Sequence, residues 1–313
     1  MRYQGLQSLN RTSAKRVKMP KASMLHLFIF LFFCSMCIAS VLYVLNDTRP
    51  REKVLFSSQY LQLPVNIRSR PRNLTVLVLS NAGNFDKRHA IRKTYGNNLH
   101  SESSLFFVVG RAAVKDENDM IDAESKLHND IIQIKITEST KALVHKVQLA
   151  YRYVVQLGQD FILKTDDDVL INLPVLLNKL KTWSRAAPTV FGHQILGATP
   201  VTDVRHKYFD ENIPESTVFP TYLSGTGYVM NRAALKLLTH CDKAVPLISL
   251  EDVYFTGYCR RYFNIQLSPQ KKFGFRRRLA IPCLLKNVIT IHGLTPVEME
   301  NYWTEINNRR ILC

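Results

Sequence analysis

The chain has 313 residues, of which 46% are hydrophobic, 12 are Gly and 13 are Pro, and this composition excludes a disordered or fibrous protein. Its formal net charge is +17. A basic chain can bind nucleic acid, but this sequence lacks an aromatic-basic RNA-binding signature, and we therefore expect no nucleic-acid partner.

The first distinct feature is an uncharged apolar stretch at 24–45, MLHLFIFLFFCSMCIASVLYVL, which is long enough to cross a bilayer as a helix. Several Lys and Arg residues and no acidic residue precede it. The positive-inside rule then predicts a cytoplasmic tail at 1–23, a transmembrane signal anchor at 24–45 and a luminal remainder. The alternative is a signal peptide cleaved near Ala39, but the apolar stretch continues well past that site.

The luminal part begins with a stretch at 46–72 that contains three prolines and lacks periodicity, and we interpret it as a stem before a domain at 73–313. Asn46 and Asn73 each begin a glycosylation sequon. Four cysteines follow the anchor, which in an oxidising compartment predicts two disulfides and leaves three pairings open. These candidates are Cys241, Cys259, Cys283 and Cys313. We hypothesise that Cys259 pairs with Cys283, because each lies beside a candidate site segment, and that Cys241 pairs with Cys313.

Apolar runs of strand length alternate with helical patterns along the domain. The predicted strands are Leu74–Leu79, Leu105–Val109, Asp130–Ile136 and Phe161–Lys164, and the predicted helices are 86–95, Thr140–Leu157 and Pro174–Trp183. Gly158 marks the expected end of the second helix. This alternation predicts an α/β domain with a mostly parallel sheet, in which ligands bind beyond the carboxyl ends of the strands.

Three consecutive aspartates, Asp166 to Asp168, lie at such a strand end, in FILKTDDDVL. Side chains at i and i+2 of an extended segment point to the same side, so Asp166 and Asp168 can converge on one divalent cation. Their oxygens select hard ions such as Mg²⁺, Mn²⁺ or Ca²⁺. The alternative is a solvated turn, but the apolar residues on both sides make that less suitable.

Other candidate residues are ambiguous taken singly. Glu251 and Asp252 open a predicted helix, where acidic residues usually complement the helix dipole. His292 follows a strand, where a histidine is more often a core residue than a ligand. Gly225 and Gly227 indicate a bend or a close backbone approach, because no third glycine completes a dinucleotide fingerprint.

Taken in order, these motifs resemble the β1,3-galactosyltransferase family (glycosyltransferase family 31) over roughly 74–310. The matching segments are RHAIRKTY at 88–95, KTDDD at 164–168, FPTYLSGTGYVM at 219–230, EDVYFTG at 251–257 and IHG at 291–293. The family's D-F-x-D-x-Y-x-N-L-T-L-K-T block is replaced by IKITESTKALVHK at 134–146, where Lys146 and the apolar positions persist.

The resemblance implies a GT-A nucleotide-sugar-binding fold, Rossmann-like with a mostly parallel sheet, behind the N-terminal transmembrane helix. It implies a UDP-sugar donor and Mn²⁺, with Asp168, His292 and Asp166 near the metal and Asp252 as the general base. By the same match, the donor-binding residues are Arg88, Arg92, Lys164, Asp166 and Asp167. The residues of the acceptor loop are Tyr222, Gly225, Gly227 and Glu251.

The implied function is an inverting, Mn²⁺-dependent hexosyltransferase that moves galactose from UDP-galactose to a glycan of a glycoprotein or glycolipid in β1,3 linkage. The implied location is the Golgi membrane, as a single-pass type II protein with a luminal catalytic domain. One alternative is a β1,3-transferase that uses UDP-GlcNAc or UDP-GalNAc. A second is a non-catalytic glycan-binding Golgi protein, which we would expect to have lost Asp168 or Asp252, and a third is a metal-dependent luminal phosphohydrolase.

Overall fold

A computed structural model of the chain describes residues 60–64, 73–99, 103–277, 281–308, 310 and 313. The chain from Ser58 to Cys313 forms one compact unit. Among the described residues, no helix combines the length and the apolar character needed to cross a membrane. The predicted tail and anchor at 1–45, and the sequon residue Asn46, lie outside the described residues.

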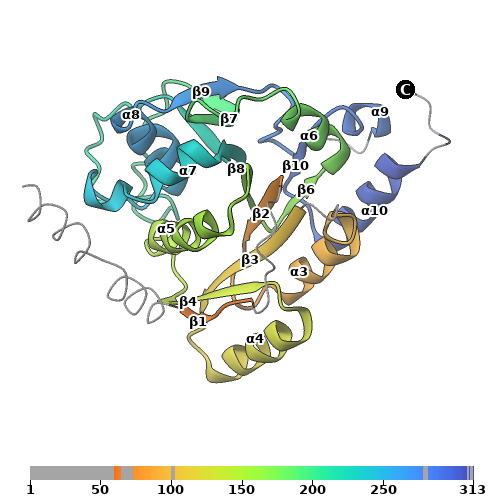
Figure 1. Cartoon of the computed structure of the whole chain (residues 1–313). Coiled ribbons are helices and arrows are strands. Elements are labelled where there is room, and N and C mark those ends of the chain that lie inside the picture. The colour runs from red at the N-terminus through yellow and green to blue at the C-terminus, as the bar shows by residue number, and fades with distance from the viewer. Residues whose placement is uncertain (1–59, 65–72, 100–102, 278–280, 309, 311–312) are drawn as a thin grey trace, which may run out of the picture. The chain divides into compact units, whose positions relative to one another are not determined.

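An eight-stranded mixed sheet runs through the unit in the order β1-β4-β3-β2-β5-β8-β7-β9 (Figure 1). The strands from β4 to β5 are parallel to one another, whereas β8 is antiparallel to both β5 and β7. The strand bounds are β1 Tyr60–Gln62, β2 Leu74–Leu79, β3 Ser103–Arg111, β4 Ile131–Thr137, β5 Phe161–Asp166, β7 Thr189–Ile195, β8 Tyr222–Asn231 and β9 Gln266–Pro269. A separate pair, β6 Val169–Ile171 and β10 Thr290–His292, is antiparallel.

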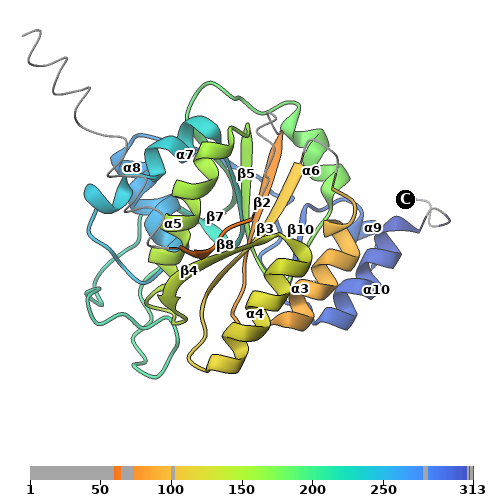
Figure 2. The ribbon, with the colours of Figure 1, turned by 60° about the horizontal axis from the view of Figure 1, so that its bottom comes forward.

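Helices cover both faces of the sheet (Figure 2). On one side are α3 Phe85–Ile91, α4 Lys115–His128 and α10 Pro296–Asn307, and on the other are α5 Leu143–Val154 and α7 Arg232–Leu238. The remaining helices are α6 Leu173–Leu180, α8 Arg260–Tyr262 and α9 Pro282–Leu285, with π-helical segments η1 Arg92–Gly96 and η4 Val253–Cys259 and short 3₁₀ turns η2 Val155–Leu157 and η3 Cys241–Lys243.

The two faces of the central strands both carry apolar side chains, as expected of a parallel sheet covered on both sides. Along β2, Val76 and Val78 belong to the core cluster that contains Ile121 of α4 and Met299 of α10. Leu77, which alternates with them, is equally buried and points to the opposite face. The continuous apolar run of β2 in the sequence therefore reflects burial on both of its faces.

The predicted strands and helices are confirmed, with shifts at their ends. α5 begins at Leu143, three residues after the expected Thr140, and continues through η2 to Gly158, whose φ of 81° gives the left-handed end expected for a glycine. β1 lies inside the segment predicted as a stem and pairs with β4, so the sheet begins before residue 73.

The two disulfides join Cys241 to Cys259 and Cys283 to Cys313. All four cysteines of the domain are bonded as expected, but the hypothesised pairing of Cys259 with Cys283 was wrong. The reason is local. The fold places Cys241 of η3 beside Cys259 at the end of η4, with Cα atoms 5.7 Å apart, and Cys283 of α9 beside Cys313, with Cα atoms 5.4 Å apart.

Candidate active site

The aspartates lie where the strand order reverses. The chain passes from β2 to β3 and β4 on one side and then returns to β5 on the other side of β2, and the last residue of β5, Asp166, pairs with Leu79 of β2. In open α/β sheets such a switch point opens a crevice beyond the carboxyl ends of the strands. This edge of the sheet therefore suits ligand binding before any side chain is considered.

A cleft of about 490 Å³ opens at this edge. Its walls come from the loop after β2, from the loop between β4 and α5, and from the end of β5, with His292 of β10 at one side. The polar lining residues include Asn81, Lys87, Glu138, Lys146, Asp166, Asp167, Asp168, Lys207, Tyr208 and His292. The structure thus brings Asp166, Asp168 and His292 to one cleft, although they come from two distant parts of the sequence.

Asp167 has a different environment from its two neighbours. Its Oδ2 accepts hydrogen bonds from Ser80 Oγ at 2.8 Å and Asn84 Nδ2 at 2.7 Å, and its Oδ1 accepts from Lys87 Nζ at 2.9 Å. The residue is buried, at 6% exposed. Both oxygens are therefore engaged by side chains of the loop after β2 and of α3, so Asp167 has a structural role, and the donor-binding role implied by the resemblance stays a prediction.

Asp168 and His292 face each other across the β6–β10 pair. His292 is paired with Val169, the residue after Asp168, and Asp168 Oδ2 lies 3.6 Å from His292 Nε2. Asp168 Oδ1 is buried without a hydrogen-bond partner. Burial raises the pKa of Asp168, the Asp166 carboxylate raises it further, and His292 opposes this rise.

These two side chains fit a divalent cation. An unpartnered buried carboxylate oxygen is costly unless something binds it, and a carboxylate beside an imidazole nitrogen can together hold a divalent cation. Within the described part of the chain, no group of three or more His, Cys, Asp or Glu side chains converges as a ready metal site. The protein therefore offers two close ligands, with Asp166 in the same cleft, and the remaining ligands have to come from substrate or water.

Asp252, the predicted base, directly precedes η4 and is held by two backbone amides. Its Oδ2 accepts from Gly225 N at 2.9 Å, and its Oδ1 accepts from Val253 N at 2.9 Å. A Cβ atom at position 225 would lie 3.1 Å from Asp252 Oδ2, so a glycine lets this carboxylate approach β8. Burial raises the pKa of Asp252, while the positive charge of Lys164 works against the rise.

The other residues that the resemblance assigns to the acceptor loop contact neighbouring strands and buried side chains. Gly227 allows β8 to pass close to β10, because a Cβ atom there would lie 3.1 Å from Thr290 Cγ2. Tyr222 is half-buried, and burial together with the Asp252 charge raises its pKa to about 12. Glu251 is buried in an ion pair with Lys164, whose Nζ lies 2.9 Å from Glu251 Oε2.

The two arginines expected at the donor lie away from the cleft lining. Arg88 is fully buried, and its guanidinium donates to both oxygens of Glu124 and to the carbonyls of Asn81 and Ala82. Arg92 binds Asp130 through two hydrogen bonds of 2.8 Å and also contacts Glu124. Arg88 thus joins α3 to α4 and holds the loop after β2, and Arg92 joins η1 to Glu124 and Asp130. Neither arginine lines the cleft.

Sequence reasoning missed one buried ion pair in the wall of the cleft. Lys146 Nζ lies 2.9 Å from Glu138 Oε2 and donates to Ser80 O at 3.0 Å, and Glu138 Oε1 accepts from Gly110 N at 2.6 Å. An acidic residue directly after β4, at the carboxyl edge of the sheet, was the available signal. It lies in the block where the sequence departs from the family pattern.

Comparison with known proteins then defines the class. Residues 86–271, more than half of the chain, match the family model described as "Galactosyltransferase". This match includes the aspartates at the end of β5, the Gly225 segment of β8 and Asp252. The chain belongs to the galactosyltransferase family and is a UDP-sugar glycosyltransferase.

The relatives refine this result. Beta-1,3-galactosyltransferase 1 of Mus musculus is 28% identical over 88% of this chain and 95% of its own length. The human N-acetyllactosaminide beta-1,3-N-acetylglucosaminyltransferase 4 is 32% identical over 78% of this chain and 68% of its own length. Human beta-1,3-galactosyltransferase 5 is 28% identical over 93% of this chain and 97% of its length.

Solved structures are more distant. A glycosyltransferase involved in the glycosylation of the major capsid of PBCV-1 is 12% identical, with a TM-score of 0.39 over 74% of this chain and 98% of that chain. A likeness at this level carries no argument here.

Proposed function

We propose that the protein transfers galactose from UDP-galactose to an acceptor glycan in β1,3 linkage, with inversion at the anomeric carbon and with Mn²⁺ as cofactor. The observation that carries the proposal is the Asp168–His292 pair, with its unpartnered carboxylate oxygen, in a cleft at the strand-order switch point. A nucleotide diphosphate bound there would complete the coordination of a cation that the two side chains begin.

The reaction balances with the residues present. The acceptor hydroxyl attacks the anomeric carbon, the bond from that carbon to the diphosphate oxygen breaks, and the diphosphate leaves with the electron pair. Asp252, held by the Gly225 and Val253 amides, takes the proton of the acceptor hydroxyl. Asp168 and His292 would hold the divalent ion, which when bound supplies Lewis-acid stabilisation of the leaving diphosphate.

We further assign the α/β unit to the GT-A fold and the protein to the Golgi membrane, as a type II protein. The fold assignment is supported by the parallel strands β4 to β5 and by the site at their carboxyl ends. The location is supported by the uncharged stretch at 24–45 with basic residues before it. Asn73, at the start of β2, and Asn46 remain predicted glycosylation sites.

A second candidate donor is UDP-N-acetylglucosamine. The relative that is 32% identical carries the name of a β1,3-N-acetylglucosaminyltransferase, whereas the two galactosyltransferases are 28% identical. The chemistry at Asp168, His292 and Asp252 is the same for both.

The proposal is tested with the full chain solubilised in detergent, Mn²⁺, and a panel of UDP-galactose, UDP-N-acetylglucosamine and UDP-N-acetylgalactosamine. Oligosaccharides ending in galactose, N-acetylglucosamine or N-acetylgalactosamine serve as acceptors, and the product linkage is read by NMR. We expect a β1,3-linked galactose and loss of transfer on chelation of the metal. An α-linked product, or release of free phosphate without transfer to any acceptor, would contradict the proposal.

A further inference from the structure

The first observation concerns Lys164, a lysine buried inside β5 with 2% of its surface exposed. Its Nζ contacts Asp166 Oδ1 at 3.0 Å, Gly225 O at 2.7 Å and Glu251 Oε2 at 2.9 Å. A lysine ammonium has three protons to donate, and three acceptors surround this one. Lys164 therefore has no proton left for a donor phosphate, and the donor-binding role implied by the resemblance does not suit it.

The second observation concerns the carboxylate oxygen of Glu251 that does not contact Lys164. The other oxygen of Glu251, Oε1, accepts a hydrogen bond from the Tyr228 hydroxyl, which lies 2.6 Å from the Tyr151 hydroxyl. Glu251, Tyr228 and Tyr151 are all buried. Because a buried charge is tolerated only when it is paired and hydrogen-bonded, this arrangement allows Glu251 little freedom to move.

The third observation joins this pair to the base. Gly225 accepts from Lys164 through its carbonyl oxygen and donates to Asp252 Oδ2 through its own N–H. Lys164 thus fixes the residue whose amide holds the carboxylate, and Glu251 is fixed one residue before Asp252. The ammonium group of Lys164 therefore fixes Asp252 in two ways, through Gly225, which donates to the carboxylate, and through Glu251, the preceding residue.

We propose that Lys164, Glu251 and Tyr228 form a buried clasp that positions Asp252 for proton transfer and ties it to Asp166 at the cleft. The inference rests on the proposed function, since it takes Asp252 as the base. The three are positioning residues, because they act through Asp252 and none of them lines the cleft. The clasp also explains why Asp166 and Glu251, which come from different segments, share the ammonium group of Lys164.

The test compares two variants that each remove one buried hydroxyl. Tyr228→Phe removes the hydrogen bond to Glu251, whereas Tyr151→Phe leaves that bond in place and serves as the matched control. Rates are measured on the full chain with UDP-galactose and expressed per Mn²⁺-dependent UDP-binding site. We expect Tyr228→Phe to lower kcat about tenfold with the KM for UDP-galactose unchanged, and Tyr151→Phe to change kcat by less than about twofold.

A double-mutant cycle separates positioning from general damage. Combined with Asp252→Asn, Tyr228→Phe should cause almost no further loss, because the group through which it acts is already gone. The same tenfold loss in both backgrounds would overturn the proposal, and so would equal losses in Tyr228→Phe and Tyr151→Phe. Wild-type turnover is measured alongside, so an absence of transfer by the wild type marks failure of the proposed function and not of the clasp.

Lys164 itself is tested in a charge-neutral pair, Lys164→Met with Glu251→Gln, which avoids leaving one buried charge alone. We expect kcat per UDP-binding site to fall about a hundredfold, the scale of a lost general base, while the affinity for Mn²⁺ and UDP stays within about threefold of wild type. A loss of UDP affinity with an unchanged kcat would show Lys164 to be a donor ligand and would overturn the proposal. If this pair fails to fold, the tyrosine variants still decide the matter.

Discussion

Three consecutive aspartates at the end of β5 have three different partners. Asp166 binds the buried ammonium of Lys164, Asp167 binds the loop after β2 and Lys87 of α3, and Asp168 faces His292. The structure places Asp166 and Asp168 in one cleft, but Asp167 lines it as well, because β5 ends at Asp166 and a turn follows. The sequence pattern predicts the convergence of Asp166 and Asp168 on one site. It does not predict the partners, because Ser80, Lys87 and His292 come from segments that only the folded sheet brings near.

Asp167 is expected to stabilise the fold and not to bind the ligand. Asp167→Asn removes an acceptor that three side chains share, and we expect a loss of about 1–3 kcal/mol in the free energy of unfolding. The measurement is thermal unfolding, with Mn²⁺-dependent UDP binding determined per folded molecule. Asp168→Asn is the control from the same triple and should leave the melting temperature nearly unchanged, because Asp168 Oδ1 has no protein partner.

The base gives a prediction for the pH dependence of turnover. Burial raises the pKa of Asp252 above the usual 3.8, so this carboxylate takes up a proton at a higher pH than a free aspartate does. Because only the deprotonated form accepts a proton, kcat/KM should be full above the raised pKa and should fall as the pH drops through it. A profile of kcat/KM that stays flat down to pH ~4 would contradict the role of Asp252.

The candidate site could be predicted in part from the sequence. The structure places Asp168 and His292 together in the cleft, as the order of the motifs predicts, and the role of Asp252 as the base stays a prediction. The roles of Arg88 and Lys164 are harder to predict from the sequence, because a basic residue in a motif can bind a phosphate of the ligand or pair with a buried carboxylate. Only the presence of Glu124 and Glu251 beside them distinguishes the two cases.

At the scale of elements, long apolar runs are predicted reliably and short or irregular elements are not. β2 and β5 are continuous buried runs, whereas β6 has only three residues and is a strand because β10 pairs with it. The π-helical turns η1 and η4 have no periodic signal, since their extra residues follow from tertiary packing. β1 is similar, because it depends on the exposed edge of β4.

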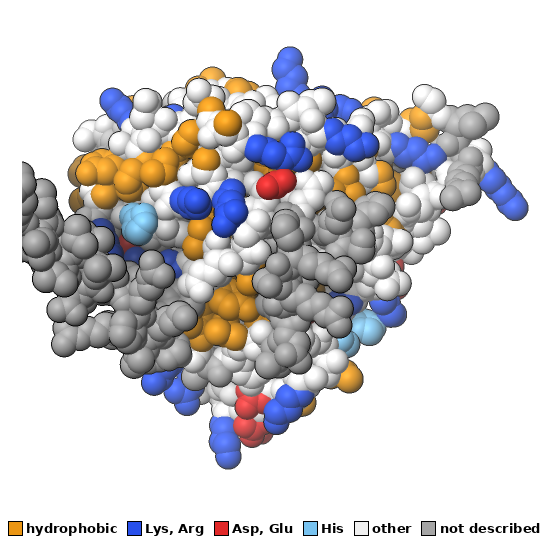
Figure 3. Space-filling view, in the orientation of Figure 1, with side chains coloured by type: hydrophobic (Ala, Val, Ile, Leu, Met, Phe, Trp, Pro, Cys, Tyr) orange, Lys and Arg blue, Asp and Glu red, His pale blue; other side chains and the backbone are white. Residues whose placement is uncertain are grey.

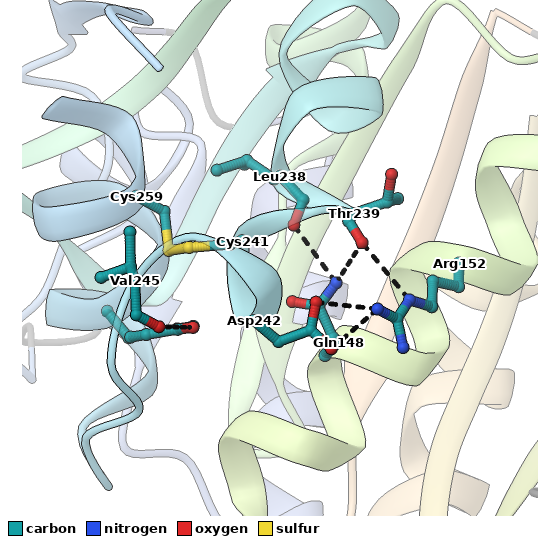
Figure 4. Close-up of a disulfide and its surroundings, with 9 residues drawn as sticks. Gln148, Arg152, Leu238, Thr239, Cys241, Asp242, Val245 and Cys259 are labelled. Carbon is teal, nitrogen blue, oxygen red and sulfur yellow. Dashed lines mark hydrogen bonds and ion pairs between the residues drawn. A yellow bond between two sulfur atoms is a disulfide. The ribbon is translucent and has the colours of Figure 1, made fainter. Parts of the chain in front are cut away.

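The disulfide between Cys241 and Cys259 ties η3 to the end of η4, the element that begins after Asp252 (Figure 4). Arg152 of α5 adds an ion pair to Asp242 at 2.7 Å, and Gln148 donates to the carbonyl of Thr239 at 2.8 Å. The disulfide, the ion pair and the hydrogen bond together connect α5, the end of α7 and η4. The other disulfide holds the C-terminal residue to α9.

We expect replacement of Cys241 and Cys259 together by Ser to lower the free energy of unfolding by about 3 kcal/mol, the scale for a loop of this length. It should also lower kcat, because η4 follows the base directly. The matched control replaces Cys283 and Cys313, which should lower the melting temperature and leave kcat unchanged. Equal effects of the two double replacements on kcat, measured below both melting temperatures, would show that the Cys241–Cys259 disulfide has no special role in catalysis.

At the scale of the whole molecule, charge fits an anionic donor. Lys and Arg side chains are spread over the face seen in Figure 3, on which acidic side chains are few. A basic surface raises the local concentration of a negatively charged nucleotide sugar. The buried acidic groups at the cleft are an exception to this surface charge, as a cation site requires.

The central claim assigns the metal and the proton to different carboxylates, and one measurement tests it directly. Asp168→Asn and Asp252→Asn are compared in the full chain for Mn²⁺-dependent UDP binding and for turnover with the best UDP-sugar. Asn can replace only one of the two acceptor oxygens of Asp252, so each variant is first checked for an intact fold by circular dichroism.

Asp168→Asn should weaken Mn²⁺-dependent UDP binding and turnover together, because it removes the ligand with the unpartnered oxygen. Asp252→Asn should keep UDP binding while turnover falls about a hundredfold or more, the scale of a lost general base. Near-normal turnover of Asp252→Asn would place the base elsewhere. Unchanged Mn²⁺-dependent UDP binding in Asp168→Asn would remove Asp168 from the metal site and contradict the account.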